Sequence, residues 1–269
     1  MTDPKSIAII SDTPSLYVRW LVEDLVQRDS AARWVFIGST TEHRLFVYQS
    51  FLRILRRHGW REVIWRAMDR THADDSRSLT RPQSLECLQL RTGFEVVRYD
   101  HIDSGKMLLD LMQRDPALVL LAGCGIVSSA LLGIASLGVL NGHPAMLPGV
   151  RGVDVIDWSI LYDAPIGVTA HFAAPNVDAG DIVAQRRVEP EPGESWINFK
   201  DRIVRNQADC LAEAAVQVLA GKTRCKTNDV SKSRLCFATR RSDRRMAEAK
   251  FSQLMQTSSR EAVHVTYPE

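Results

Sequence analysis

A chain of 269 residues with 45% hydrophobic and 25% charged residues is long enough to bury one substantial core, with room for a second small lobe. The net charge of +2 is too small to indicate nucleic acid as the main partner, and no apolar stretch is long enough to span a membrane. The start, MTDPKSIAIIS, lacks the charged and then apolar layout of a signal peptide, so we expect a cytoplasmic protein. The cysteines form no CxxC pair, which argues against a disulfide framework and against a cysteine zinc site; they are Cys87, Cys124, Cys210, Cys225 and Cys236.

The first forty residues are typical of a βαβ unit. Ser6 to Ser11 is a short apolar run of the kind found in buried parallel strands, and Trp34 to Gly38 is a second strand. Between them, Leu16 to Val26 has the periodicity of a helix, with Asp12 and Thr13 as candidate caps. The unit contains no GxGxxG, so it lacks the dinucleotide-binding fingerprint.

Thr41 to Pro82 interrupts this pattern with tryptophans, phenylalanines and nine arginines. Gly59 divides the stretch into two predicted helices, which end in a polar loop. One interpretation is an anion-binding lobe for phosphate or pyrophosphate. The alternative, which charge runs on helices more often favour, is an amphipathic helical pair whose arginines cover its solvent face. Under the first interpretation, the candidates for substrate binding are Arg53, Arg56 and Arg57.

The most apolar predicted strand, Leu118 to Ala122, is expected to lie at the centre of the sheet. It follows a predicted strand at Phe94 to Tyr99 and a helix that Ser104 caps and that runs to about Arg114. Its exit loop is Gly123-Cys124-Gly125-Ile126-Val127, and glycines at such a place let main-chain N–H groups reach a ligand. Cys124 in this loop is interpreted as a small packed residue, because no partner base for a nucleophile is identifiable.

A short strand from Gly138 to Asn141 leads to an amide and an imidazole on one face. Asn141 and His143 stand at i and i+2, so both side chains point the same way. Gly142 between them allows close approach of another backbone or a ligand, and Pro144 stops the strand. Taken alone, Asn141 could merely cap the strand and His143 could be a satisfied buried histidine.

A carboxylate is predicted to join this pair. Asp178 begins the turn Asp178-Ala179-Gly180-Asp181-Ile182, which opens a strand from Ile182 to Val188. An aspartate in such a turn is more often structural than catalytic. An amide, an imidazole and a carboxylate that converge at one strand edge nevertheless outline a catalytic site.

The remaining elements are predicted to complete one domain. Val153 to Leu161 is helical by periodicity, Ile166 to Phe172 alternates as a strand, and Ser195 starts a long helix, Trp196 to Ala220, that Gly221 ends. His171 on the alternating strand is assigned to packing.

The chain beyond this helix is predicted to be less regular. Lys222 to Lys250 is basic and weakly periodic, and Phe251 to Glu269 is expected to fray. We therefore divide the chain into a catalytic domain, residues 1–222 with a helical insertion at 41–84, and a basic C-terminal extension, residues 223–269.

The stretch Asn141 to Ile182 resembles the formyltransferases that use 10-formyltetrahydrofolate, a family that includes glycinamide ribonucleotide transformylase, methionyl-tRNA formyltransferase and the sugar N-formyltransferases. The matching elements are Asn141-x-His143-Pro144, Leu147-Pro148, Arg151-Gly152, Gly167-Val168-Thr169-x-His171 and Asp178-x-Gly180-x-Ile182. Two positions depart from the family, Ala145 where Ser is common and Gly142 where a larger apolar residue is usual. The resemblance implies an α/β, Rossmann-like formyltransferase fold, with a mostly parallel twisted sheet flanked by helices.

The resemblance also implies roles for individual residues. Asn141 would donate an N–H to the formyl oxygen, His143 would stabilise the tetrahedral intermediate and assist proton transfer, and Asp178 would orient His143 and take the proton of the attacking amine. Arg151 and Gly152 would contact the substrate. The residues that would bind the folate are Gly123, Gly125, Ile126, Val127, Asn176, Val177 and Gly180. No metal is expected, so a metal site from His143, His171 and Asp178 is a minor alternative.

The expected reaction is transfer of a formyl group from 10-formyltetrahydrofolate to a primary amine of a small molecule, which we expect to be a nucleotide-linked amino sugar. The chain lacks room for the large C-terminal β-barrel of methionyl-tRNA formyltransferase, so no nucleic acid partner is expected. Other acceptors stay open, namely a glycinamide-type phosphate, an amino acid or a hydroxylamine, as do 10-formyltetrahydrofolate hydrolysis and a catalytically silent folate-binding protein. No membrane partner is expected, and a homodimer is one open assembly.

Overall fold

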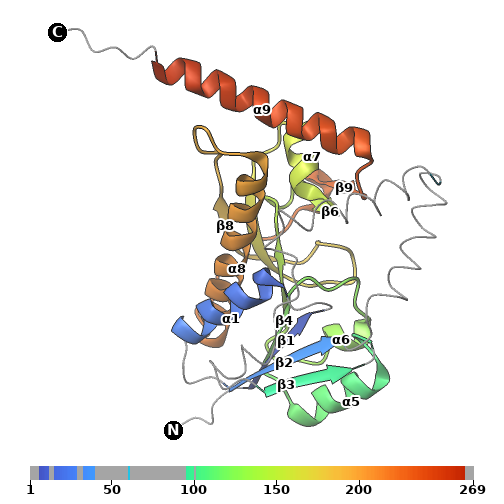
Figure 1. Cartoon of the computed structure of the whole chain (residues 1–269). Coiled ribbons are helices and arrows are strands. Elements are labelled where there is room, and N and C mark those ends of the chain that lie inside the picture. The colour runs from blue at the N-terminus through green and yellow to red at the C-terminus, as the bar shows by residue number, and fades with distance from the viewer. Residues whose placement is uncertain are drawn as a thin grey trace.

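The structure, a computed structural model, describes residues 6–11, 15–28, 33–39, 60, 95–99 and 101–263, with the backbone alone at 6, 33–39 and 257–263. Within this part, seven strands form one sheet in the order β3-β2-β1-β4-β5-β7-β8 (Figure 1). Arg53, Arg56 and Arg57, and all of the 41–84 insertion except Trp60, lie outside the described residues.

The sheet is mostly parallel. The first five strands pair in parallel, and the last two pair antiparallel to their neighbours. In chain order they are β1 (Ser6–Ser11), β2 (Arg33–Ser39), β3 (Glu95–Tyr99), β4 (Leu118–Leu121), β5 (Val139–His143), β7 (Gly167–Phe172) and β8 (Ile182–Arg187). The strands predicted from apolar runs are thus confirmed, and β5 extends two residues further than expected, through His143.

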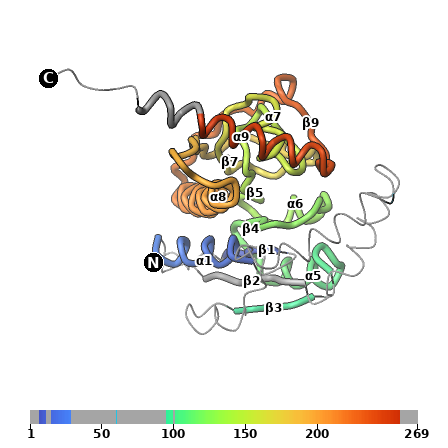
Figure 2. The backbone as a smooth tube through the Cα atoms, turned by 45° about the horizontal axis from the view of Figure 1, so that its top comes forward, coloured from blue at the N-terminus to red at the C-terminus, as the bar shows by residue number. Residues whose placement is uncertain are grey.

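Helices cover both faces of the sheet, as Figure 2 shows. On one face lie α1 (Leu16–Arg28) and the long α8 (Trp196–Leu219), and on the other lie α5 (Gly105–Arg114) and the short α6 (Ser129–Leu132). Ser104 caps α5 as predicted, because its side chain accepts the N–H of Met107. The α/β architecture with a mostly parallel sheet is confirmed.

The two faces of β5 belong to different cores. Leu140 packs with residues of α1 and α8, whereas Val139 packs with residues of α5 and α6. Because side chains alternate along a strand, Asn141 and His143 lie on the Val139 face and Gly142 lies on the face covered by α1 and α8. This alternation points the two candidate catalytic side chains away from the larger core.

A small ribbon joins the region after β5 to the last part of the chain. Strand β6 (Val150–Gly152) pairs in parallel with β9 (Arg234–Cys236), and α7 (Val155–Leu161) follows β6. A single 3-10 turn, Val230–Lys232, precedes β9. The predicted boundary at residue 222 stays a prediction, but the segment after it contributes a strand to this ribbon.

Fraying beyond Phe251 is wrong as far as residue 263, because Arg241–Val263 forms one helix, α9. Phe251 is buried in a cluster with Trp196 and Phe199, whose ring centroids lie 5.1 and 4.9 Å from its own. The residues of α9 that face the core, Ala247, Phe251 and Met255, form a single stripe four residues apart. A stripe this narrow on a basic helix gives only weak periodicity, which explains why the sequence did not predict the helix.

Candidate active site

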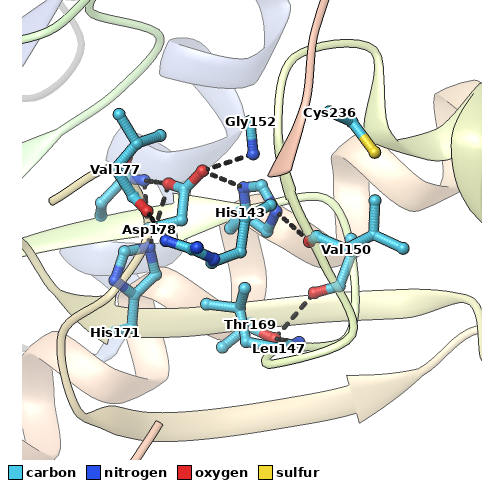
Figure 3. A network of polar contacts seen from close by, with 12 residues as sticks. His143, Leu147, Val150, Gly152, Thr169, His171, Val177, Asp178 and Cys236 are labelled. Atoms are coloured by element: carbon cyan, nitrogen blue, oxygen red, sulfur yellow. Dashed lines mark hydrogen bonds and ion pairs between the residues drawn. The ribbon is translucent and has the colours of Figure 1, made fainter. Parts of the chain in front are cut away.

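The catalytic candidates meet where β5 and β7 pair (Figure 3). In this antiparallel pair Asn141 lies opposite His171 and His143 lies opposite Thr169, so all four side chains share one face of the sheet. The Asn141 Nδ2 atom lies 3.2 Å from His171 Nε2. The register between the two strands therefore places a second imidazole beside the predicted amide.

Asp178 lies in the loop after β7, and its carboxylate faces the side chains of Asn141, His143 and His171. Its Oδ1 atom accepts a long hydrogen bond from Asn141 Nδ2 at 3.4 Å and lies 3.6 Å from His171 Nε2. Its Oδ2 atom lies 3.6 Å from His143 Nδ1. The predicted convergence of Asn141, His143 and Asp178 is therefore present in the structure.

The Asp178 loop is held in place by groups from two other segments. Oδ2 of Asp178 accepts the main-chain N–H of Gly152 at 2.9 Å, and Arg151 Nη1 donates to the carbonyl of Val177 at 2.6 Å. From the C-terminal segment, Asn228 Nδ2 donates to the carbonyls of Asp178 and Gly180 at 2.9 and 3.1 Å. Arg151 and Gly152, predicted to bind substrate, are here engaged in bracing this loop.

Only glycine fits at position 152. Its φ of 103° is in the region that side chains rarely adopt, and a Cβ would lie 2.1 Å from the carbonyl oxygen of Cys236. This close approach is the β6–β9 pairing itself, in which Gly152 lies opposite Cys236. The β6–β9 pairing and the hydrogen bond to Asp178 thus both require that residue 152 has no side chain.

The carboxyl of Asp178 is strongly acidic. Burial opposes its ionisation, but the nearby imidazoles of His171 and His143 and the N–H of Gly152 outweigh burial and lower the pKa to about 2. The carboxylate is therefore ionised at neutral pH and fixed by several donors.

His143 is buried and favours its neutral form. Burial lowers the pKa of His143, and the nearby Asp178 opposes this only in part. Its Nε2 atom lies 3.0 Å from the carbonyl oxygen of Val150, which can only accept, so Nε2 carries the hydrogen. In the neutral ring Nδ1 is then the basic nitrogen, and it faces Asp178.

The loop after β4 begins beside Asn141, because Leu121 at the end of β4 is the register partner of Asn141. Gly123 has a φ of 76°, which turns the chain, and Ile126 at the loop tip is 84% exposed. Val177, in the other predicted folate loop, is also exposed. These two apolar side chains on neighbouring loops suit a flat apolar ligand ring.

Cys124 is packed, as interpreted from the sequence. Its Sγ lies 2.9 Å from the carbonyl oxygen of Ile10, and the side chain contacts the core on the α5 side of the sheet.

Two residues of the site were missed or misassigned. His171 was assigned to packing, but its ring contacts Asn141 and Asp178, while its Nδ1 donates to the carbonyl of Phe172 at 2.8 Å. The i, i+2 spacing of Thr169 and His171 could have indicated this, given the register of β7 with β5. Asn228 gave no signal, since it lies 50 positions after Asp178 in a weakly periodic segment.

Among the described residues, no group of three or more His, Cys, Asp and Glu side chains is arranged to hold a metal ion. In the same part of the chain, no helix is both long and apolar enough to cross a membrane.

Residues 92–215 match the model of the formyl transferase family. Methionyl-tRNA formyltransferase of Staphylococcus aureus strain Newman is 24% identical over 168 residues, which are 62% of this chain and 54% of that protein. The chain thus spans about half the length of this curated relative.

Solved structures share the fold. A sugar N-formyltransferase from a Shewanella species superposes with a TM-score of 0.59 at 16% identity, covering 91% of this chain and 87% of the other. Glycinamide ribonucleotide transformylase 1 from Symbiobacterium toebii gives a TM-score of 0.57 at 17% identity, with 85% and 96% covered. At such identities the likeness concerns the fold alone.

Proposed function

We propose that this chain, whose residues 92–215 belong to the formyl transferase family, transfers a formyl group from 10-formyltetrahydrofolate to a primary amine of a small molecule. The observation that carries the proposal is the convergence of Asn141, His143 and Asp178 beside two loops that present exposed apolar side chains. In the reaction the amine nitrogen bonds to the formyl carbon, the bond from that carbon to the folate nitrogen breaks, and one proton passes from the amine to the folate.

Asn141 is suited to stabilise the oxygen that becomes negative when the amine attacks. Its Nδ2 points to the Asp178 carboxylate, which orients the amide. That hydrogen bond is long, at 3.4 Å, so a small rotation of the whole amide group can direct this N–H to a substrate oxygen at little cost. His171, at 3.2 Å, holds the same amide from across the strand pair.

Asp178 and His143 are suited to move the proton. The carboxylate is ionised, and the basic Nδ1 of His143 lies 3.6 Å from it, so a proton taken up by the imidazole is stabilised by the neighbouring negative charge. Because Nε2 donates to Val150, this proton enters on the Asp178 side of the ring. The donor supplies an already activated formyl group, and this pair of residues accepts and returns the proton without a metal.

The acceptor that we propose is an amino sugar linked to a nucleotide. A cavity of about 390 Å³ lies next to the β6–β9 ribbon, and its lining includes Trp158, Tyr162, Arg234, Cys236 and Phe237. Stacked aromatic rings and guanidinium groups are the side chains that hold a base and a pyrophosphate, and the Arg234 guanidinium lies 4.6 Å from the Tyr162 ring. Sugar N-formyltransferases among the similar folds, such as the Shewanella protein, support the same choice.

Release of tetrahydrofolate from 10-formyltetrahydrofolate, with a panel of amines, tests the proposal. Nucleotide-linked amino sugars should give formylated product, and the Asn141→Ala variant should not. Product only from a glycinamide-type phosphate or an amino acid would overturn the proposed acceptor, and tetrahydrofolate release without any amine would indicate a hydrolase. If the cavity holds the nucleotide, Arg234→Ala raises the KM for the sugar substrate, whereas Arg224→Ala, an exposed arginine outside the cavity, does not.

A further inference from the structure

Gly142, between the two catalytic candidates on β5, faces the core under α1 and α8. A Cβ at this position would lie 2.6 Å from the hydroxyl oxygen of Tyr17 and 3.3 Å from Cγ of Gln207. The φ of Gly142 is not among the positive values of the chain, so packing rather than backbone conformation requires glycine here. The place of the missing side chain is taken by a polar pair from two helices.

Gln207 holds the same residue through its main chain. Its Nε2 donates to the carbonyl of Gly142 over 2.7 Å. Strand β4 pairs with β5 only as far as Asn141, so this donor acts one residue beyond the end of that pairing. The peptide that links Gly142 to His143 is therefore anchored to α8.

Tyr17 completes the contact from α1. Its ring is buried in the same core as Leu211 and Leu140, and its hydroxyl lies beside the Gln207 side chain. The hydroxyl and the Gln207 amide thus meet at the one position of β5 that carries no side chain.

We propose that Gln207 is a positioning residue for formyl transfer. Gln207 holds the Gly142 carbonyl, and the Tyr17 hydroxyl fills the space beside Gly142. Together these contacts fix the position of the β5 backbone at residues 141–143, and so the distances from the Asn141 and His143 side chains to Asp178. At position 142 the strand is therefore held by the hydrogen bond from Gln207, whereas an apolar side chain there would hold it by packing into the core. This inference rests on the proposed function for its kinetic readout but not for its structural one.

Gln207→Met removes the donor and keeps the length of the side chain. We expect kcat to fall about tenfold while the KM for 10-formyltetrahydrofolate stays within about twofold, because misplacement affects the transition state more than binding. Gln217→Met is the matched control, since Gln217 lies on the same helix and its amide bonds Glu213 Oε1 one turn away. In Gln207→Glu only the protonated carboxyl can donate, so kcat should recover as the pH is lowered.

The NMR titration of the His143 ring reports position without turnover. It should shift in Gln207→Met, because the distance to Asp178 changes, and stay as in the wild type in Gln217→Met. If the wild type transfers no formyl group, the proposed function fails while this titration still tests the positioning. A kcat within about twofold of the wild type together with an unchanged His143 titration would overturn the role of Gln207.

A double-mutant cycle tests the packing if Gln207→Met does not fold. Gly142→Ala should lower the melting temperature, because its Cβ meets the Tyr17 hydroxyl, and Tyr17→Phe in the same chain should restore most of the loss by removing that oxygen. Additive effects of the two changes would show that the hydroxyl does not occupy the space at position 142, and would overturn the arrangement on which the inference is built.

Discussion

The main-chain N–H of Gly152 donates to Oδ2 of Asp178, although the two residues are 26 positions apart. A main-chain donor cannot rotate away as a side chain can, so this oxygen of the carboxylate is fixed. The other oxygen faces Asn141 and His171. The fixed oxygen, Oδ2, is also the one that lies 3.6 Å from His143 Nδ1, so the Gly152 N–H holds in place the oxygen that faces this imidazole.

Asp178→Asn should lower kcat by about a hundredfold, because the ionised carboxylate that stabilises the proton on His143 is lost. The fold should persist, since the amide can still accept the N–H of Gly152. Asp181→Asn, an exposed aspartate at the end of the same loop, is the control and should leave kcat unchanged. Steady-state kinetics give kcat for both variants. Equal values of kcat in Asp178→Asn and Asp181→Asn would contradict a catalytic role for Asp178.

Gly152→Ala is expected to destabilise the protein by about 2–4 kcal/mol, because the added Cβ meets the Cys236 carbonyl and the backbone is left-handed. Gly193→Ala shares the positive φ but has open space around it, so it should cost only about 1 kcal/mol. Urea denaturation of both variants measures the difference. If Gly152→Ala lowered the free energy of unfolding no more than Gly193→Ala does, the β6–β9 ribbon would have to shift at little cost to accept the added Cβ, and the prediction would be wrong.

Stability should fall in two steps as the pH is lowered. Burial lowers the pKa of His143, so as the pH falls the ring takes up a proton in the unfolded state before it does so in the folded state. The contribution of His143 to the free energy of unfolding is therefore complete above the ordinary pKa of about 6.5, and it is lost as the pH falls towards the pKa of the folded state. The pKa of Asp178 is lowered to about 2, so its contribution is complete above about 4 and is lost as the pH falls towards 2.

Denaturant titrations across the two ranges measure these steps. The His143→Gln variant should lose the dependence of stability on pH between 5 and 7 that the folded imidazole causes, and should keep the dependence below pH 4. The same slope between pH 5 and 7 in both proteins would contradict the assignment to His143.

Asn228→Leu should raise the KM for 10-formyltetrahydrofolate, because it frees the carbonyls of Asp178 and Gly180 and loosens the predicted folate loop. A change of about five- to tenfold corresponds to roughly 1 kcal/mol, the order of magnitude expected when the two hydrogen bonds of this one amide are lost. Asn198→Leu, at an exposed position on α8, provides the comparison. If the KM for 10-formyltetrahydrofolate were the same in both variants, Asn228 would not be needed to hold the Asp178 loop for folate binding.

Phe251→Ala should destabilise the protein by about 3–5 kcal/mol, since its ring is buried against Trp196 and Phe199. Leu254→Ala on the same helix should cost much less, because that side chain is 41% exposed. Thermal melts of the two variants provide the measurement. Similar melting temperatures would mean that α9 is not packed as described.

The sequence predicted those parts of the molecule that depend on neighbours along the chain. Apolar runs located the strands of the large sheet, and Ser104 and Ser195 located the starts of their helices, because both signals are local. Asn141 and His143 share a face through their spacing alone. Parts that depend on pairing between distant segments were not predicted: three-residue strands such as β6 and β9 are too short to show periodicity.

Residues of the site divide in the same way. His171 joins the site only through the register of β7 with β5, and Asn228 only through the fold of the C-terminal segment. The departure at Gly142 was visible in the sequence. Its reason lies in the Tyr17 hydroxyl and the Gln207 side chain, two residues on different helices that are 190 positions apart along the chain. Spacing alone cannot reveal such contacts.

The pairing of β6 with β9 also sets an order of events during synthesis. Arg151 contacts Ser233, 82 positions later. At elongation rates of about 5–20 residues per second, the ribosome releases the catalytic strands roughly four to sixteen seconds before the segment that braces the Asp178 loop. Closing so long a loop adds contact order, which slows folding. A nascent chain therefore carries Asn141, His143 and Asp178 before it carries the segment that braces the Asp178 loop, so the candidate site takes its final geometry only after that later segment has emerged.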